Sequence, residues 1–80
     1  MEIQVAGPGC PKCHELEKLV SEVVQAHGIQ AQVSKITDYA EILQTGVMST
    51  PGLIVNGQVK VSGKVPSKDE ITRIIESEAD

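Results

Sequence analysis

The stretch VAGPGCPKCHELEKLV, residues 5–20, decides the fold, because it joins the end of a strand to the start of a helix. The Gly7-Pro8-Gly9 segment interrupts the alternating strand pattern that precedes it. Pro11 suits the first turn of a helix, because proline lacks the backbone N–H that this turn leaves unpaired. The stretch therefore predicts a helix that carries Cys10 at its N-terminus and Cys13 one turn later.

The pattern after the cysteines is that of a long amphipathic helix. Apolar or weakly polar side chains recur with helical spacing at Leu16, Leu19, Val20, Val23, Val24 and His27. Gly28 supplies the stop that commonly ends a helix, and a cation such as His27 is favoured beside the last carbonyl groups. We expect this stripe to pack on a sheet.

Alternation returns in IQAQVSKI, residues 29–36, and predicts a second strand with Ile29, Ala31, Val33 and Lys35 in phase. The next stretch, TDYAEILQTG, predicts a short helix that ends at Gly46. Asp38 and Glu41 have the spacing of a capping box. We expect the apolar face of this helix to comprise Tyr39, Ile42 and Leu43.

The segment GLIVNGQVKVSG, residues 52–63, contains the strongest local signal of the chain. Asn56-Gly57 between two strand-like runs predicts a hairpin with a two-residue type I′ turn. A last helix follows, in which Ser67 and Glu70 form a capping box. We expect its buried stripe to be Ile71, Ile74 and Ile75.

The elements succeed one another in the order β-α-β-α-β-β-α, within a single domain of residues 1–80. The first β-α-β unit should be a right-handed parallel crossover, and the hairpin should add antiparallel strands. The predicted fold class is α/β, with a mixed four-stranded sheet and helices on both faces.

Composition narrows the classes of function. The net charge of −4 disfavours nucleic acids and anionic membranes, and Tyr39 is the single aromatic residue, so base-stacking platforms are missing. The first residues lack the basic and apolar regions of a signal peptide, and no apolar run is long enough to span a membrane. We therefore expect a cytoplasmic protein, in which two close cysteines are more often catalytic or metal-binding than structural.

The segment Cys10-Pro11-Lys12-Cys13-His14 allows three chemistries. As C-x-x-C at a helix start it is a dithiol redox site, and as C-x-x-C-H it is an attachment motif for c-type haem. Two thiols and the His14 imidazole could also bind Zn(II), Cu(I) or arsenic(III). The haem interpretation fits poorly, because such attachment normally occurs after export and requires a large apolar pocket.

The redox interpretation assigns different roles to the two cysteines. Backbone N–H groups and the helix dipole favour a thiolate at Cys10, and Lys12 adds a nearby positive charge. Cys10 is then the exposed nucleophile and Cys13 the more buried resolving thiol. His14 could tune the Cys13 thiolate or relay its proton. Both His14 and Lys12 could instead be solvated surface residues with no role in the chemistry.

The whole pattern resembles the thioredoxin-like superfamily. The resemblance rests on the C-x-x-C motif after a first strand, Thr50-Pro51 before a third strand, the Asn56-Gly57 hairpin and a closing helix. It is closest to the small glutaredoxin-like redox proteins of archaea and bacteria, whose N-terminus reads like GPGCPKC. It implies a minimal thioredoxin-like fold and a cis Thr50–Pro51 bond that lies against the disulfide.

The same resemblance implies that the Thr50 backbone pairs with an extended substrate peptide, as in strand addition. The implied apolar rim for a protein partner is Gly9, Pro11, Val47, Met48 and Pro51. Two features depart from the family pattern. Gln4 occupies the position where typical thioredoxins carry a buried acid, and the glutathione features of glutaredoxins are weak.

We therefore expect a monomeric thiol-disulfide oxidoreductase that reduces disulfides in protein or small substrates. Its electron donor should be of the thioredoxin-reductase type, and the reaction should need neither a cofactor nor a metal. Two alternatives remain open. One is a non-catalytic dithiol carrier of a soft metal or arsenic(III), and the other is a thioredoxin-like adaptor in which the thiols are incidental.

Overall fold

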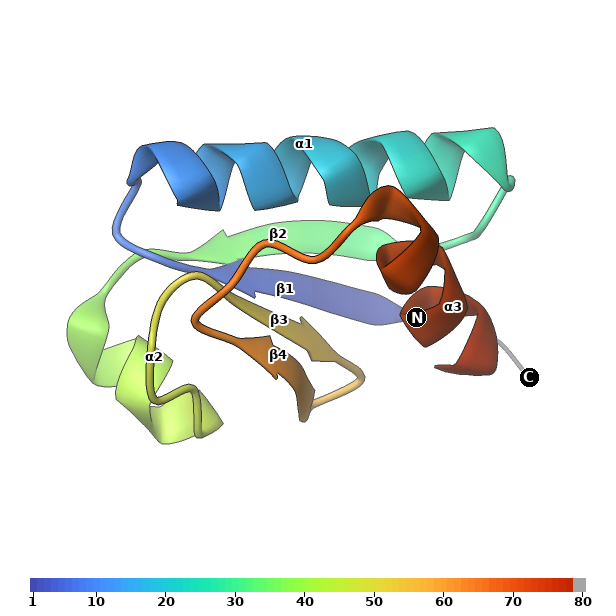
Figure 1. The fold of residues 1–80 in the computed structure, drawn as a ribbon. Helices are drawn as coiled ribbons and strands as arrows, with labels where there is room; N and C mark the ends of the chain where they lie inside the picture. Colours follow the sequence, from blue (N-terminus) through green and yellow to red (C-terminus); the bar gives the residue numbers. More distant parts are fainter. Residues whose placement is uncertain (79–80) are drawn as a thin grey trace.

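The computed structural model describes residues 1–78 and shows a four-stranded sheet with three helices (Figure 1). The strands are β1 (Glu2–Ala6), β2 (Gln32–Ile36), β3 (Gly52–Val55) and β4 (Gln58–Ser62). The helices are α1 (Pro11–Ala26), α2 (Tyr39–Thr45) and α3 (Lys68–Glu78). The predicted order β-α-β-α-β-β-α is confirmed.

The sheet is mixed, with the strand order β2-β1-β3-β4. β1 and β2 are parallel, whereas β3 is antiparallel to both β1 and β4. The ends of β1, β2 and β4 and the start of β3 therefore lie at one edge of the sheet, at the left of Figure 1. The N-terminus and α3 lie at the other end.

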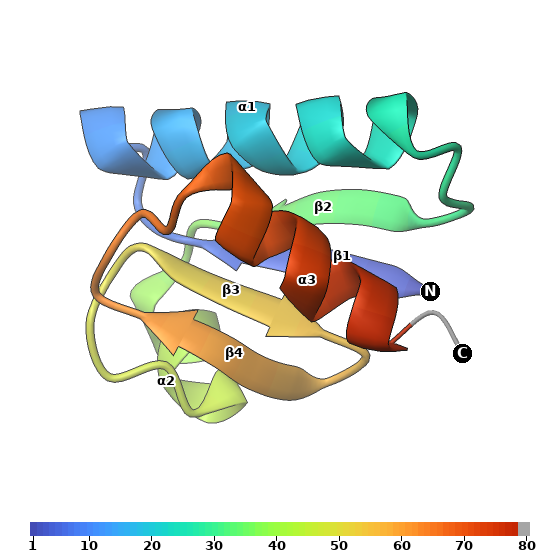
Figure 2. The ribbon, with the colours of Figure 1, turned by 45° about the vertical axis from the view of Figure 1, so that its right-hand side comes forward.

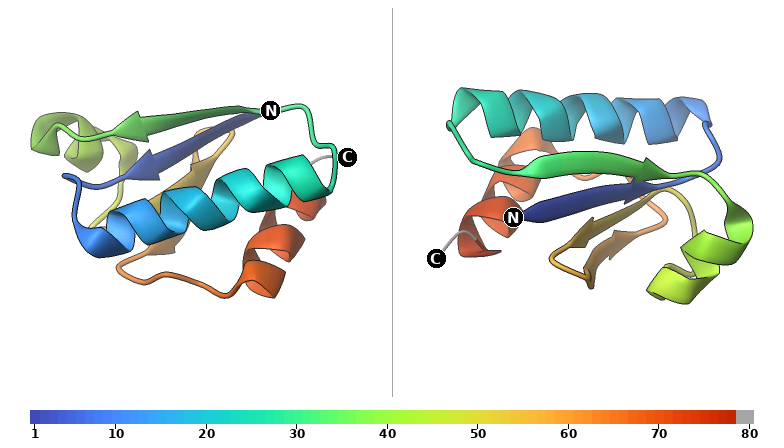
Figure 3. Two further views of the ribbon diagram at one scale, coloured as in Figure 1. Left: turned by 90° about the horizontal axis from the view of Figure 1, so that it is seen from above. Right: turned by 180° about the vertical axis from the view of Figure 1, so that it is seen from behind.

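Helices cover both faces of the sheet, as expected. α1 and α3 pack on one face and α2 on the other, which the turned views make plain (Figures 2 and 3). The core under α1 and α3 comprises Ile3, Val5, Leu16, Val20, Val23, Leu53, Val55, Val61, Ile71 and Ile75. The smaller core under α2 comprises Ala6, Ile36, Ile42, Val47 and Ile54.

The β3–β4 connection is the predicted two-residue hairpin. Asn56 has a φ of 51° and Gly57 a φ of 81°, and a type I′ turn requires positive φ at both positions. Asn56 has a second role, because its side-chain Oδ1 accepts the Glu2 N–H at 3.0 Å. The turn thus joins the hairpin to the start of β1.

Replacement of Gly57 by alanine should destabilise the protein by about 1–2 kcal/mol, because a Cβ disfavours the left-handed backbone. The measurement is urea denaturation, with the exposed neighbour Gln58→Ala as control. Nothing lies within 4 Å of the added Cβ, so backbone conformation alone is tested. An unchanged midpoint for Gly57→Ala would contradict this assignment of the turn.

Local capping agrees with the sequence at most helix ends. Asp38 caps α2, although its carboxylate accepts the Ala40 N–H at 2.9 Å instead of the Glu41 N–H of a capping box. Ser67 Oγ accepts the Glu70 N–H at 3.2 Å, as predicted for α3. Gly46 ends α2 in the left-handed conformation.

Two apolar stripes are narrower than predicted. His27 is the C-cap of α1 but is exposed, and its Nδ1 lies 3.7 Å from the Glu76 carboxylate, so it does not belong to the buried stripe. Tyr39 and Leu43 are 63% and 70% exposed, and Ile42 alone of the predicted face of α2 is buried. A helix of seven residues at the end of the sheet covers little of its surface.

The second strand is also shorter than its alternating pattern. β2 begins at Gln32, while Ile29 and Ala31 precede it and still pack against the main core. Lys35 keeps the predicted phase, pairing with Val5 across the strands, and its Nζ lies 3.5 Å from the Glu17 carboxylate of α1. Across residues 1–78, no helix is both long and apolar enough to cross a membrane.

Candidate active site

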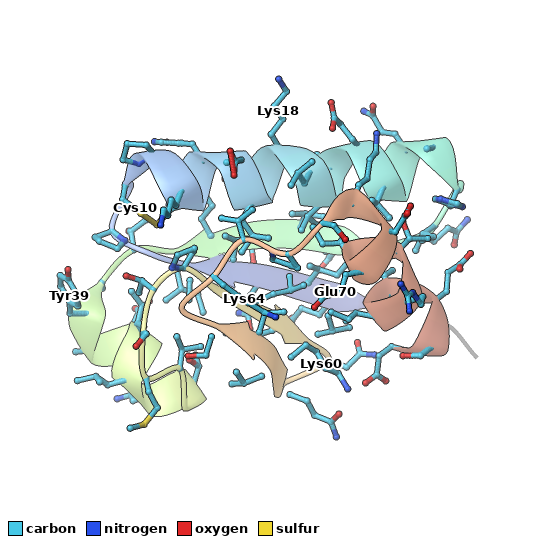
Figure 4. All side chains as sticks on the ribbon, in the orientation of Figure 1. Cys10, Lys18, Tyr39, Lys60, Lys64 and Glu70 are labelled. Carbon is cyan, nitrogen blue, oxygen red and sulfur yellow. A yellow bond between two sulfur atoms is a disulfide. The ribbon has the colours of Figure 1, made fainter. Side chains whose placement is uncertain are left out.

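Cys10 lies at the N-cap of α1, as the sequence predicts, but it is half-buried and not exposed. Its backbone is extended (φ −71°, ψ 163°), and Pro11 takes the first helical position. The Cys10 Sγ accepts the Cys13 backbone N–H at 3.2 Å, which satisfies one of the N–H groups left unpaired at the helix start. The sulfur therefore meets the positive end of the α1 dipole (Figure 4).

Cys13 lies one turn along α1 and faces the sheet. It is 5% exposed and shares the buried face of the helix with Leu16 and Val20. A disulfide joins it to Cys10, with the two Cα atoms 5.1 Å apart. The pair is thus asymmetric, since Cys10 is half-buried and Cys13 is buried.

The charges around the first turn of α1 favour an anion. This turn holds no acidic residue, and Lys12 is exposed beside Cys10. A thiolate released by reduction of the disulfide would meet the N-terminal N–H groups of α1, with no carboxylate in the same turn.

The loop before β3 brings the second half of the site to the disulfide. The Thr50–Pro51 peptide bond is cis, in agreement with the family resemblance. The Pro51 carbonyl accepts the Gly63 N–H at 2.8 Å, and Ser62 Oγ bonds to both the N–H and the carbonyl of Ser49. The end of β4 therefore holds this loop in place from the side opposite α1.

Gly7 lies where the two halves of the site meet. A Cβ built on Gly7 would overlap the Cys13 Sγ, and it would lie 3.0 Å from the Cys13 Cβ and 3.9 Å from the Thr50 Cβ. Thr50 is thus adjacent to the enclosed sulfur. Within residues 1–78, neither the backbone N–H nor the carbonyl of Thr50 has a hydrogen-bond partner, which leaves both groups free for a ligand.

The rim around the disulfide is smaller than the resemblance implies. Val47 is 2% exposed and Pro51 is fully buried. Neither side chain is therefore available to a partner. Gly9 and Pro11 are exposed, and Met48 is 89% exposed. Of the implied rim, Gly9, Pro11 and Met48 are therefore the exposed members, and Thr50 beside Pro51 is half-buried.

His14 lies on the exposed surface of α1, and Gln4 lies on the face of the sheet opposite α1. His14 is exposed on α1, and its backbone N–H bonds to the Cys10 carbonyl at 3.1 Å. Gln4 is half-buried and pairs with Ser34 and Ile54, on the face of the sheet opposite α1. Among residues 1–78, no three His, Cys, Asp or Glu side chains form a group that could hold a metal ion.

Two contributors to the site were missed by sequence reasoning. The sequence indicates Gly7 only as part of a strand-ending break, and Ser62 only as part of the hairpin segment 52–63. The GPG segment did offer a signal for Gly7, since a glycine at a strand end often marks the close approach of another group. Ser62 gave no signal, because its bonds to Ser49 depend on the relation between β4 and the loop before β3.

Comparison with known proteins places this site in a family. The model of the thioredoxin domain family matches residues 1–76. The chain is 44% identical over 75 residues to a thioredoxin of Methanothermobacter thermautotrophicus, which covers 94% of this chain and 97% of the relative. It is 37% identical over 75 residues to a thioredoxin of Methanocaldococcus jannaschii, and this match covers 94% of this chain and 86% of the relative.

A probable thioredoxin of Archaeoglobus fulgidus is 32% identical over 71 residues, covering 85% of this chain and 77% of the relative. The family match over residues 1–76 spans both the cysteine pair and the Thr50–Pro51 loop. With its disulfide at the helix N-terminus, the chain belongs to the thioredoxin domain family and is a thiol-disulfide oxidoreductase.

Proposed function

We propose that Cys10 is the nucleophile of this oxidoreductase and Cys13 its resolving thiol. The observation that carries the proposal is the asymmetry of the disulfide, in which Cys10 is half-buried at the helix N-cap and Cys13 is 5% exposed. A bulky disulfide substrate can reach the first sulfur and cannot reach the second. Stabilisation of an anion at the N-cap favours the same assignment.

The reaction then takes two exchanges. The Cys10 thiolate attacks one sulfur of the substrate disulfide, a mixed disulfide forms, and the other substrate sulfur leaves as a thiolate that takes a proton. The Cys13 thiolate next attacks the Cys10 Sγ, which closes the Cys10–Cys13 disulfide and releases the second substrate thiol. Two electrons pass from the protein to the substrate, and a reductase of the thioredoxin-reductase type returns them.

The substrate is proposed to bind in extended form along Thr50. Thr50 lies near the buried Cys13, and its N–H and carbonyl, which have no partner within residues 1–78, can pair with a peptide backbone, as in strand addition. The exposed rim residues Gly9, Pro11 and Met48 then contact the partner. A backbone-paired ligand of this kind is a protein or peptide disulfide, and we expect glutathione to be a poorer substrate.

This proposal is tested by reduction of insulin disulfides with thioredoxin reductase and NADPH as the electron source. We expect steady turnover, and much slower turnover when glutathione and glutathione reductase replace that source. The matched control is Cys10→Ser, which should be inactive with either donor. Efficient turnover by the Cys10→Ser protein would contradict the proposed roles.

Met48 provides a test of the rim. Because this side chain is 89% exposed, Met48→Ala should leave stability unchanged and raise KM for insulin by about threefold, a loss of less than 1 kcal/mol of contact. Reduction of a small aromatic disulfide should proceed at the wild-type rate. The control is Leu43→Ala on α2, also exposed, which should alter neither activity. An equal effect of both substitutions on insulin reduction would remove Met48 from the rim.

A reducing dithiol works where thiols are kept reduced, so we propose the cytoplasm as its compartment. We also propose that it acts as a monomer, since one chain supplies the cysteines and the Thr50 loop. Sedimentation equilibrium at working concentration, with activity measured across the same range, tests the second point. Activity that rises with dimer content would contradict it.

A further inference from the structure

The crowding at Gly7 points to a role in setting the balance between the disulfide and the dithiol. We propose that Gly7 is a positioning residue: its missing side chain provides the space in which Cys13 Sγ lies when bonded to Cys10. This inference rests on the proposed roles of the two cysteines but concerns the equilibrium between their oxidation states. By this proposal Gly7, the residue directly after β1, influences the equilibrium between the disulfide and the dithiol.

Neither the backbone at Gly7 nor helix α1 is free to move away from the other. Gly7 is buried, and its N–H bonds to the Ile36 carbonyl at 2.8 Å, which ties it to β2. On the other side, α1 is held against the sheet by Leu16 and Val20, both 0% exposed. A methyl group on residue 7 must therefore displace the sulfur itself, because the two backbones are fixed.

The two redox states respond differently to such displacement. In the disulfide, Cys13 Sγ is restrained by its bond to Cys10 and cannot turn away from residue 7. In the dithiol, the same sulfur is free to rotate about χ1 to another staggered position. The added methyl should thus disfavour the oxidised form more than the reduced form. The Thr50 Cβ, 3.9 Å from the same point, limits the space into which the bonded sulfur could shift.

The test is the equilibrium of the Gly7→Ala protein with glutathione. Protein disulfide and two glutathione thiols give protein dithiol and one glutathione disulfide, with two electrons and two protons passing to the protein. We expect Gly7→Ala to shift this equilibrium at least tenfold toward the dithiol, which corresponds to about 30 mV. The matched control is Val20→Ala, which weakens the packing of α1 but leaves the space around the sulfur unchanged, and it should shift the equilibrium less than twofold.

Urea denaturation of the oxidised and reduced proteins supplies the second readout. Gly7→Ala should lower the midpoint of the oxidised form more than that of the reduced form, whereas Val20→Ala should lower both alike. Equal lowering by Gly7→Ala, together with an equilibrium constant within twofold of wild type, would overturn the proposal. Loss of insulin reduction by Cys10→Ser is independent of this result, so the two proposals can fail separately.

A third variant decides the matter if oxidised Gly7→Ala protein does not fold. Cys13→Ala removes the sulfur, so the nearest atom to a methyl group on residue 7 among those described is then the Cβ of residue 13, at 3.0 Å. In this background Gly7→Ala should lower the urea midpoint by less than half of the shift it causes beside Cys13. The same or a larger shift without the sulfur would show that the crowding is unrelated to Cys13 Sγ.

Discussion

Replacement of Cys13 by serine should convert the protein from a catalyst into a covalent trap for its substrates. Cys10 remains at the N-cap of α1, so its thiolate still attacks a substrate disulfide and forms a mixed disulfide. Serine cannot attack the Cys10 Sγ in return. Because an intramolecular attack is lost, and such steps carry very high effective molarities, we expect turnover of insulin to fall by at least about 10³-fold.

The adduct itself is the diagnostic result. Reduced Cys13→Ser protein mixed with oxidised insulin should give a species, seen by mass spectrometry, that contains one insulin molecule joined by a single disulfide and disappears on addition of dithiothreitol. Cys10→Ser is the matched control, because its remaining cysteine, Cys13, is 5% exposed in the native protein and should capture no insulin. Capture by Cys10→Ser and not by Cys13→Ser would reverse the assigned roles.

Leu16→Ala should be the most destabilising of the single substitutions considered. Leu16 is 0% exposed in the main core, on the face of α1 that carries Cys13. Leucine-to-alanine changes at such sites cost about 2–5 kcal/mol, through lost burial and the cavity that remains. A chain of 80 residues has a free energy of unfolding of roughly 4–12 kcal/mol, so this variant approaches the limit of stability.

The measurement is urea denaturation of the oxidised protein, followed by circular dichroism. Leu43→Ala is the control, since it is the same chemical change at a side chain that is 70% exposed, and it should alter the free energy of unfolding by less than about 0.5 kcal/mol. Similar losses for the two variants would mean that α1 does not contribute the main core as described. Such a result would also weaken the account of how Cys13 is enclosed.

The parts of the fold that were predictable are those governed by local chemistry. Three local features act on the backbone next to them. They are a proline after an N-cap, a serine three residues before a glutamate, and an Asn-Gly pair, and each either restricts the backbone dihedral angles or accepts a backbone N–H. They therefore mark Pro11, Ser67 and Asn56 without reference to the rest of the chain. The alternation of β1 was equally clear, because one of its faces is fully buried.

The parts that were mispredicted depend on how much surface a neighbour covers. Tyr39 and Leu43 have the correct spacing for a buried face, but the sheet offers α2 only enough surface for Ile42. His27 fits the stripe of α1 but lies beyond the end of the sheet, opposite Glu76. Helical spacing defines a face, and it carries no information on where the partner surface ends.

The residues of the site likewise fall into those that the sequence predicts and those that depend on tertiary contacts. The cysteine pair is evident from its own spacing, and the Thr50–Pro51 loop was found through family resemblance and not from any local pattern. The placement of Gln4 away from α1 could have been derived, because Ile3 and Val5 alternate with it on β1. The contact between Gly7 and Cys13 could not, since it arises from the distance between the end of a strand and a helix packed upon it.

The most direct test of the central claim is the rate of alkylation of the reduced protein by iodoacetamide as a function of pH, with the modified residue mapped by mass spectrometry. A thiol at a helix N-terminus beside a lysine has a pKa below the ordinary value of about 8.5, because the N–H groups and the cation stabilise the thiolate. Cys10 should react first, with a midpoint well below that value, and Cys13 should stay unmodified. A midpoint at or above about 8.5, or earlier modification of Cys13, would contradict the account.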